Sequence, residues 1–114
     1  LLAFGNLSAM HHTGEKKPAH GKMTAAQKQA HHLEMLSETI KGNWRDPKNT
    51  PRDAYRRPYG TLGFFGVTPH SHVLEIWPGG GWYAEILVPY ATHHGSYTGA
   101  VNNPNAFEKL RAQG

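Results

Sequence analysis

Residues 72–90, HVLEIWPGGGWYAEILVPY, contain the pattern that predicts the fold class of this chain. Residues 72–76 are β-prone and bounded by turn residues, a pattern that predicts a buried strand. Three adjacent glycines follow at 79–81. Residues 82–88 are predicted to form a helix that ends at Pro89, because proline lacks the N–H group that continues a helix.

The segments on the C-terminal side continue this alternation. Residues 96–101 (SYTGAV) fit a second strand, and a helix is expected over 105–111, with Pro104 at its N-terminus. The order strand, glycine loop, helix, strand, helix is typical of the opening of an α/β sheet with parallel strands.

The glycine loop between strand and helix is the feature that points to chemistry. Residues without a Cβ adopt positive φ and let the backbone approach a ligand closely. The free N–H groups at the start of the following helix face the same place. Such a site suits a nucleotide-like cofactor at the carboxyl end of the first strand. The alternative is a tight turn that binds no ligand.

The sequence of this motif resembles the first motif of class I S-adenosylmethionine-dependent methyltransferases. It is most similar to predicted bacterial methyltransferases that carry EIWPGGGWYTEILAPY at this point. The upstream stretches RDAYRRP (52–58) and TLGFFGV (61–67) are also similar to that family. The resemblance covers residues 44–102, about half of the chain, and implies the N-terminal part of a Rossmann-like sheet, with its first two parallel strands, flanking helices and a preceding helical segment.

The resemblance also implies roles for single residues. Glu75 would be the acidic residue near the methionine part of the cofactor, with Trp82 and Tyr83 opening the helix behind the glycine turn. Asn102 stands where the family usually has a carboxylate for the ribose hydroxyls, and an amide can also hydrogen-bond hydroxyls. The implied cofactor-binding residues are Glu75, Trp77, Pro78, Gly79, Gly80, Gly81, Trp82 and Asn102.

Other side chains near the motif have expected places. The cofactor's carboxylate needs a nearby cation, for which Arg56 and Arg57 are the candidates. Trp77, like Trp82 and Tyr83, is expected to be a core or lid aromatic. Phe64 and Phe65 are expected in the core.

The implied function is that of the S-adenosylmethionine-binding portion of a methyltransferase with an unknown methyl acceptor. The family's sheet has seven strands, so the chain is expected to be an N-terminal fragment, inactive alone, with its catalytic residues beyond Gly114. The alternative is a non-catalytic α/β binding module whose basic N-terminal arm contacts an acidic partner.

Three regions are expected along the chain. Residues 1–23 form a flexible arm or the remnant of a signal peptide, so the protein is cytoplasmic by default and exported if residues 1–9 end such a peptide.

Residues 24–66 form a helical segment, in which Thr24 and Gln27 make a capping box. Its helical face comprises Ala26, Ala30, Leu33, Leu36 and Ile40, and the helix ends near Gly42. A helical turn near 52–57 and a short helix over 61–65 follow. Residues 67–114 begin the cofactor domain.

Composition excludes several classes of small protein. The 114 residues include no cysteine, which excludes disulfides, thiolate zinc sites and thiol nucleophiles.

The 12 Lys and Arg residues outnumber the 8 Asp and Glu residues, and ten of these 12 bases lie between residues 16 and 57. No interleaved aromatics or nucleic-acid module accompany them, so they predict a solvated face. The nine histidines lack zinc-site spacing, and no metal is expected. No apolar run is long enough to span a membrane.

Overall fold

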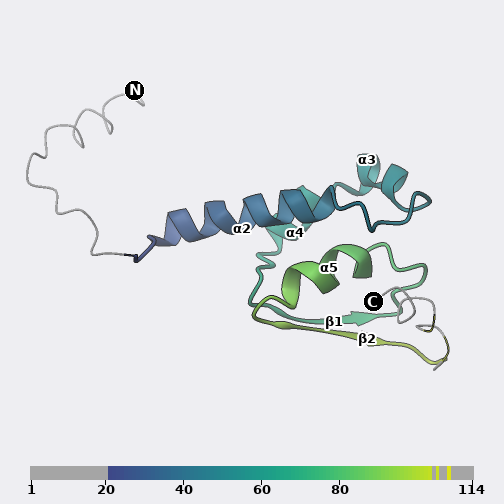
Figure 1. The fold of residues 1–114 in the computed structure, drawn as a ribbon. Helices are drawn as coiled ribbons and strands as arrows, with labels where there is room; N and C mark the ends of the chain where they lie inside the picture. Colours follow the sequence, from purple (N-terminus) through teal and green to yellow (C-terminus); the bar gives the residue numbers. More distant parts are fainter. Residues whose placement is uncertain (1–20, 104, 106–107, 109–114) are drawn as a thin grey trace, which may run out of the picture.

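The computed structural model describes residues 21–103, 105 and 108. The elements are α2 (Ala25–Ile40), η1 (Thr50–Arg52), α3 (Asp53–Arg56), α4 (Pro58–Phe64), β1 (His72–Ile76), α5 (Ala84–Ala91) and β2 (Ser96–Ala100). Figure 1 shows α5 lying on one face of the sheet, with α2 and α4 on the far side of α5. Residues 1–20 of the expected arm and most of the helix expected over 105–111 lie outside the described residues.

The two strands pair in parallel, so the described part of the chain has the expected α/β class. The register runs from His72 opposite Ser96 to Ile76 opposite Ala100. The N–H group of Trp77 donates to the carbonyl of Ala100 at 2.9 Å, which continues the pairing into the loop. Helix α5 makes the crossover that a parallel pair requires. The strands therefore bring their carboxyl ends to the same edge, beside the glycine loop.

Strand β1 is covered on one face only, which corrects the expectation of a fully buried strand. Val73 and Glu75 point toward the α5 side and are half-buried. Leu74 and Ile76 point the other way and are 62% and 69% exposed. Side chains alternate between the faces of a strand, and no second layer covers this face within the described residues.

Helix α5 differs from the expected helix at both ends. It begins at Ala84, with Tyr83 as its N-cap, and it continues through Pro89 to Ala91. Pro89 has no N–H group to offer the carbonyl of Glu85 one turn earlier. The indole Nε1 of Trp44 donates to that carbonyl instead, at 2.9 Å. A contact from a distant segment thus satisfies the backbone group that proline leaves free.

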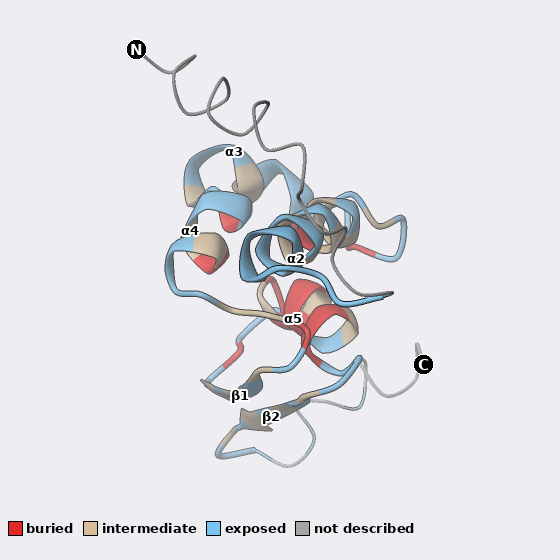
Figure 2. Ribbon diagram, turned by 90° about the vertical axis from the view of Figure 1, so that its left-hand side faces the viewer, coloured by how far each residue is buried: buried red, intermediate tan, exposed pale blue. Residues whose placement is uncertain are grey.

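The core lies where α2, α4 and α5 meet. Figure 2 shows buried residues concentrated on α5, with smaller buried patches on α2 and α4. The phenol of Tyr90 donates to the carbonyls of His32 (2.9 Å) and Val67 (3.3 Å), which ties α2 to the loop before β1. The buried core side chains are Leu36, Leu62, Trp82, Ile86, Leu87 and Tyr90.

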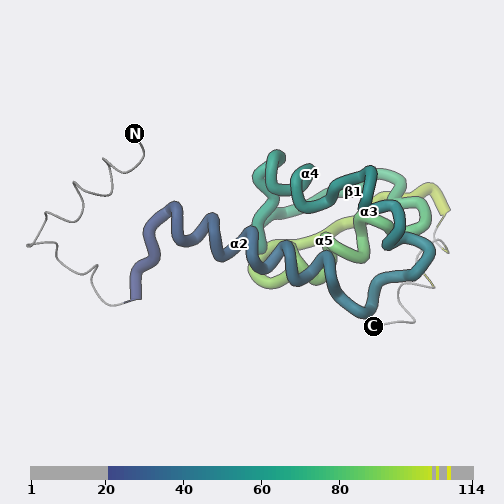
Figure 3. Tube along the Cα trace, turned by 90° about the horizontal axis from the view of Figure 1, so that it is seen from above, coloured from purple at the N-terminus to yellow at the C-terminus, as the bar shows by residue number. Residues whose placement is uncertain are grey.

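Helix α2 begins with the expected capping box between Thr24 and Gln27. Only its C-terminal half packs on the core. Ala26 and Ala30 of the predicted apolar face are exposed, whereas Leu36 is fully buried. Figure 3 shows the N-terminal half of α2 extending beyond the α/β unit, so the predicted face lacks a partner along its first two turns.

Helix α4 corrects the expectation for the two phenylalanines. The helix starts at Pro58 rather than Thr61 and turns Leu62 into the core. Phe64 lies 200° further round the helix axis than Leu62, since each residue adds 100°. Phe64 is accordingly 85% exposed. Phe65, the C-cap residue of α4, is 71% exposed, and the two rings contact each other edge to face with centroids 5.5 Å apart. No helix among the described residues is both long and apolar enough to cross a membrane.

Candidate functional site

The glycine loop joins the end of β1 to α5 through a backbone with several positive φ angles. Gly79 (φ 57°) and Gly81 (φ 82°) adopt conformations that favour glycine. Trp77 also has a positive φ, of 54°, which is a strained conformation for an aromatic residue. Its indole is exposed, so Trp77 is not a core residue. A hydrogen bond from the Gly81 N–H group to the Pro78 carbonyl (2.9 Å) closes the turn.

Gly80 differs from the glycines on either side. Its φ is not positive, and a Cβ built on it would meet no atom within 4 Å. Neither backbone conformation nor internal packing therefore requires glycine at this position. What glycine provides here is open access to the backbone from the outside.

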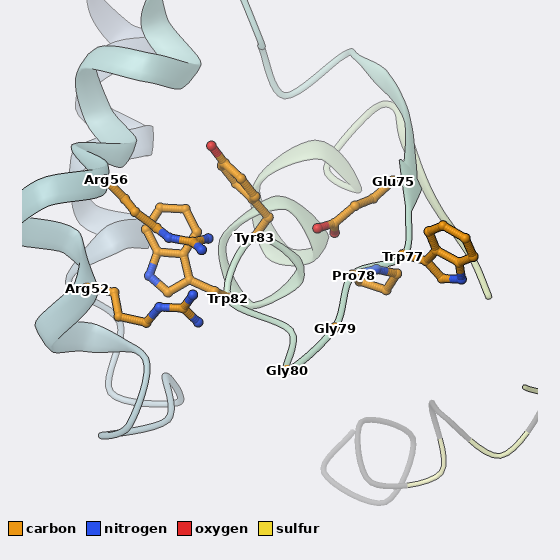
Figure 4. Close-up of a pocket in the computed structure, with 9 residues that line it drawn as sticks. All are labelled: Arg52, Arg56, Glu75, Trp77, Pro78, Gly79, Gly80, Trp82 and Tyr83. Atoms are coloured by element: carbon orange, nitrogen blue, oxygen red, sulfur yellow. The ribbon is translucent and has the colours of Figure 1, made fainter. Parts of the chain in front are cut away.

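A cavity of about 230 Å³ lies beside this loop (Figure 4). Pockets that enclose a drug-sized ligand measure roughly 300–1,000 Å³, so this cavity is sized for part of such a ligand. Its lining residues are Arg52, Arg56, Glu75, Trp77, Pro78, Gly79, Gly80, Trp82 and Tyr83. Six of the eight cofactor-binding residues expected from the sequence line the cavity. The other two, Gly81 and Asn102, do not; Asn102 is exposed and lies beyond the end of β2.

The cavity has cationic and acidic sides. Arg52 and Arg56 come from η1 and α3 on one side, and Glu75 comes from the end of β1 on the other (Figure 4). Within the described part of the chain, neither arginine has a carboxylate within ion-pair distance. Arg57, the other cation expected here, is exposed and does not line the cavity. Both signs of charge are thus available to one ligand.

Glu75 is oriented by the second strand. The phenol of Tyr97 on β2 donates to Glu75 Oε2 at 2.6 Å. Burial, and to a lesser degree this bond and the charge of Glu75, raise the pKa of Tyr97 well above its usual range, so the phenol stays a donor. The other carboxylate oxygen has no hydrogen-bond donor among the described residues.

An ion pair between the buried Arg45 and the partly buried Asp53 supports the arginine side of the cavity. The guanidinium of Arg45 binds both carboxylate oxygens of Asp53, with Nη2 at 2.9 Å from Oδ1. The indole Nε1 of Trp82 donates to the same Oδ1 at 3.0 Å. The guanidinium of Arg56 lies over the Trp82 ring, 4.8 Å from its centroid, in cation–π range. Arg45, Asp53 and Trp82 therefore fix the place of Arg56.

Several residues of the site were not expected from the sequence. Arg52 had a detectable signal, because residues 52 and 56 share one face of the helical turn that was predicted there. Arg45, Asp53 and Tyr97 act through contacts across the fold, for which no local pattern exists. No group of three or more His, Asp or Glu side chains among the described residues is arranged to hold a metal ion.

Comparisons with known proteins found no relative of this chain. Neither protein-family models, nor curated proteins, nor solved structures match this chain. The α/β class of the described part is therefore shown by the structure alone, and the motif and the geometry of the cavity are the features that bear on function.

Proposed function

We propose that the cavity binds S-adenosylmethionine and that the chain is the cofactor-binding portion of a methyltransferase. One observation carries this proposal: Gly80 lines the cavity, yet nothing within the fold requires a glycine there. A ligand that lies against the backbone supplies the missing reason. The resemblance of residues 72–90 to a methyltransferase motif points to the same cofactor.

The charges around the cavity suit the amino-acid end of this cofactor. A carboxylate is bound well by guanidinium groups, which Arg52 and Arg56 provide. An ammonium group pairs with a carboxylate, and Glu75 has one oxygen free for it within the described structure. The size of the cavity fits this part of the cofactor, and Asn102 is proposed to hydrogen-bond the ribose hydroxyls beyond it.

The chemistry of the proposed reaction belongs to the cofactor. Its sulfonium supplies an electrophilic methyl group for direct displacement by a nucleophile of the acceptor. The residues that line the cavity bind and orient the cofactor, so their contribution to the rate is the positioning of the reacting groups. The methyl acceptor is not assigned.

Titration calorimetry with S-adenosylmethionine and S-adenosylhomocysteine tests the proposal. We expect both to bind the wild-type protein and neither to bind Gly80→Val, whose side chain fills the space of the ligand. The melting temperature should stay close to that of the wild type, because a Cβ on Gly80 would meet no atom within 4 Å. Gly60→Val is the matched control, since Gly60 also faces open space but lies in α4, away from the cavity.

Two results would overturn the assignment. One is absence of binding by the wild-type protein, and the other is equal binding by Gly80→Val. Salt-dependent binding of nucleic acid or anionic lipid that survives Gly80→Val, but is lost without residues 10–28, would instead support a non-catalytic module with a basic arm.

A further inference from the structure

The peptide between Gly80 and Gly81 is held at both of its polar groups. A peptide flanked by two glycines reorients easily, because glycine tolerates positive and negative φ alike. Here the N–H group of Gly81 donates to the Pro78 carbonyl at 2.9 Å, within the loop itself. The carbonyl of Gly80 accepts from the side-chain amide of Asn49 at 3.2 Å. This second bond comes from a residue 31 positions earlier in the chain.

Asn49 is itself fixed by the first turn of α5. Its side chain is buried, with the residue only 6% exposed. The same Nδ2 atom donates to Glu85 Oε1 at 2.8 Å, and that oxygen also accepts from the Asp46 N–H group at 3.2 Å. The other oxygen of Glu85 lies 3.7 Å from Nε of the buried Arg45. Asn49 therefore connects the glycine loop to the segment that carries Arg45 and Asp53.

We propose that Asn49 is a positioning residue that fixes the orientation of the Gly80–Gly81 peptide. Asn49 does not line the cavity, so it acts on a ligand only through the loop. The N–H groups of Gly79 and Gly80, which belong to the two preceding peptides, have no acceptor among the described residues. They remain available as donors beside the cavity, next to Arg52 and Arg56.

The direction of this peptide matters for an anionic ligand group. Backbone N–H groups attract a carboxylate or phosphate, whereas carbonyl oxygens repel it. A reoriented peptide would break the bonds to both Asn49 and Pro78 and turn the carbonyl oxygen to a new direction. Asn49 keeps the Gly80 carbonyl oxygen bound to its own side chain, so that this oxygen does not turn toward an anionic group beside the Gly79 and Gly80 N–H groups. This inference rests on the proposed function for the identity of the ligand, but the orientation of the loop is testable without one.

The test compares Asn49→Ala with Trp44→Phe. Each variant removes one hydrogen bond from the 44–49 segment to Glu85, but only Asn49→Ala also removes the bond to Gly80. Protein labelled with ¹⁵N-glycine reports the loop directly, through the amide signals of residues 79–81. Calorimetry with S-adenosylhomocysteine reports binding. If Asn49→Ala does not fold, Asn49→Leu replaces it, since leucine has the same branched arrangement of side-chain heavy atoms as asparagine and lacks the amide.

We expect Asn49→Ala to shift or broaden the Gly80 and Gly81 signals and to weaken S-adenosylhomocysteine binding about tenfold, the effect of losing one hydrogen bond. Trp44→Phe should leave both readouts at wild-type values. Unchanged glycine signals in Asn49→Ala would overturn the inference. It would also be overturned if both variants lost affinity in proportion to their loss of stability. If the wild-type protein binds no S-adenosylhomocysteine, the proposed function fails, and the glycine signals alone decide the role of Asn49.

Discussion

Gly95 marks the point where the chain returns from α5 into the sheet. A Cβ on this residue would lie 2.0 Å from the carbonyl oxygen of Ser71 and 2.7 Å from that of Ala91, both of them backbone atoms. The N–H group of Gly95 donates to the Ala91 carbonyl at 2.9 Å, so the contact with the end of α5 is fixed. Unlike a flexible side chain, the backbone here cannot give way cheaply.

Gly95→Ala is therefore expected to lower the free energy of unfolding by at least about 2 kcal/mol, through overpacking against the backbone. Urea denaturation measures this change. Gly60→Ala is the control: Gly60 lies inside α4, faces open space and has no positive φ. Alanine there should raise stability by about 0.5–1 kcal/mol. Equal urea midpoints for the two variants would contradict the packing seen around Gly95.

At the scale of residues, the sequence predicted the part of the site that is contiguous. Glu75, Pro78 and Gly80 follow one another in a single motif, and all three line the cavity. The contact between Asn49 and Gly80 spans 31 positions and depends on how the proline-rich segment packs against α5. Such contacts depend on tertiary packing. Periodic patterns in a single sequence indicate helices and strands, but not which distant residues meet. The residues that support the loop and the cavity from other parts of the chain, such as Asn49, were therefore not predicted.

At the scale of elements, a histidine cluster lies where α2 meets the loops of the α/β unit. The ring of His32 on α2 lies 5.7 Å from that of His70, which precedes β1. His70 in turn stacks on His94, which follows α5, with centroids 4.7 Å apart. Burial, followed by the charges of His70, His31 and Lys28, lowers the pKa of His32. Protonation of this residue is disfavoured while α2 is docked.

The stability of the protein should therefore fall on acidification. The folded state binds protons less readily at His32 than the unfolded state, whose histidine pKa is about 6.5. The stabilisation is complete above that pH and is lost as the pH falls through the lower pKa of the folded state. We expect urea midpoints to drop as the pH falls below about 6.5, the histidine pKa of the unfolded state, and to drop less in His32→Asn.

The control for this measurement is His72→Asn. His72 lies outside the cluster and bonds Ser96 Oγ at 2.9 Å on the exposed side of the sheet. This variant should keep the pH dependence of the wild type. If the urea midpoint of His32→Asn fell with pH as steeply as that of the wild type, the histidine cluster would not be the cause of the acid destabilisation.

The type of each main element was predictable because it depends on local residues. The capping box at Thr24 and the β-prone stretch before the glycines specify a helix start and a strand without reference to the rest of the chain. Which face of an element is buried was less predictable. Phe64 is exposed because Leu62, two residues earlier on α4, occupies the face that meets the core, and Pro89 lies inside α5 because Trp44 satisfies the carbonyl that it leaves free.

At the scale of the whole molecule, helices cover only one of the two faces of the sheet within the described residues. Helices α2 and α4 contact each other, α2 also packs on α5, and α5 covers one face of the sheet (Figure 1). The opposite face carries the exposed side chains of Leu74 and Ile76, with Thr98 and Ala100 beside them on β2. Water-exposed apolar side chains that adjoin one another form a patch of the kind that binds apolar molecules.

This open face should bind the dye anilinonaphthalene sulfonate while the protein is fully folded. The double variant Leu74→Thr, Ile76→Thr is expected to reduce the dye fluorescence severalfold with little change in melting temperature, because neither side chain packs on the core. Val73→Thr is the matched control, since Val73 lies on the same strand but faces α5 and packs against the core. It should lower the melting temperature and leave the dye signal of the folded protein unchanged. Dye binding that persists in the double variant would mean that another surface, such as the exposed Phe64 and Phe65 pair, is the main apolar patch of the molecule.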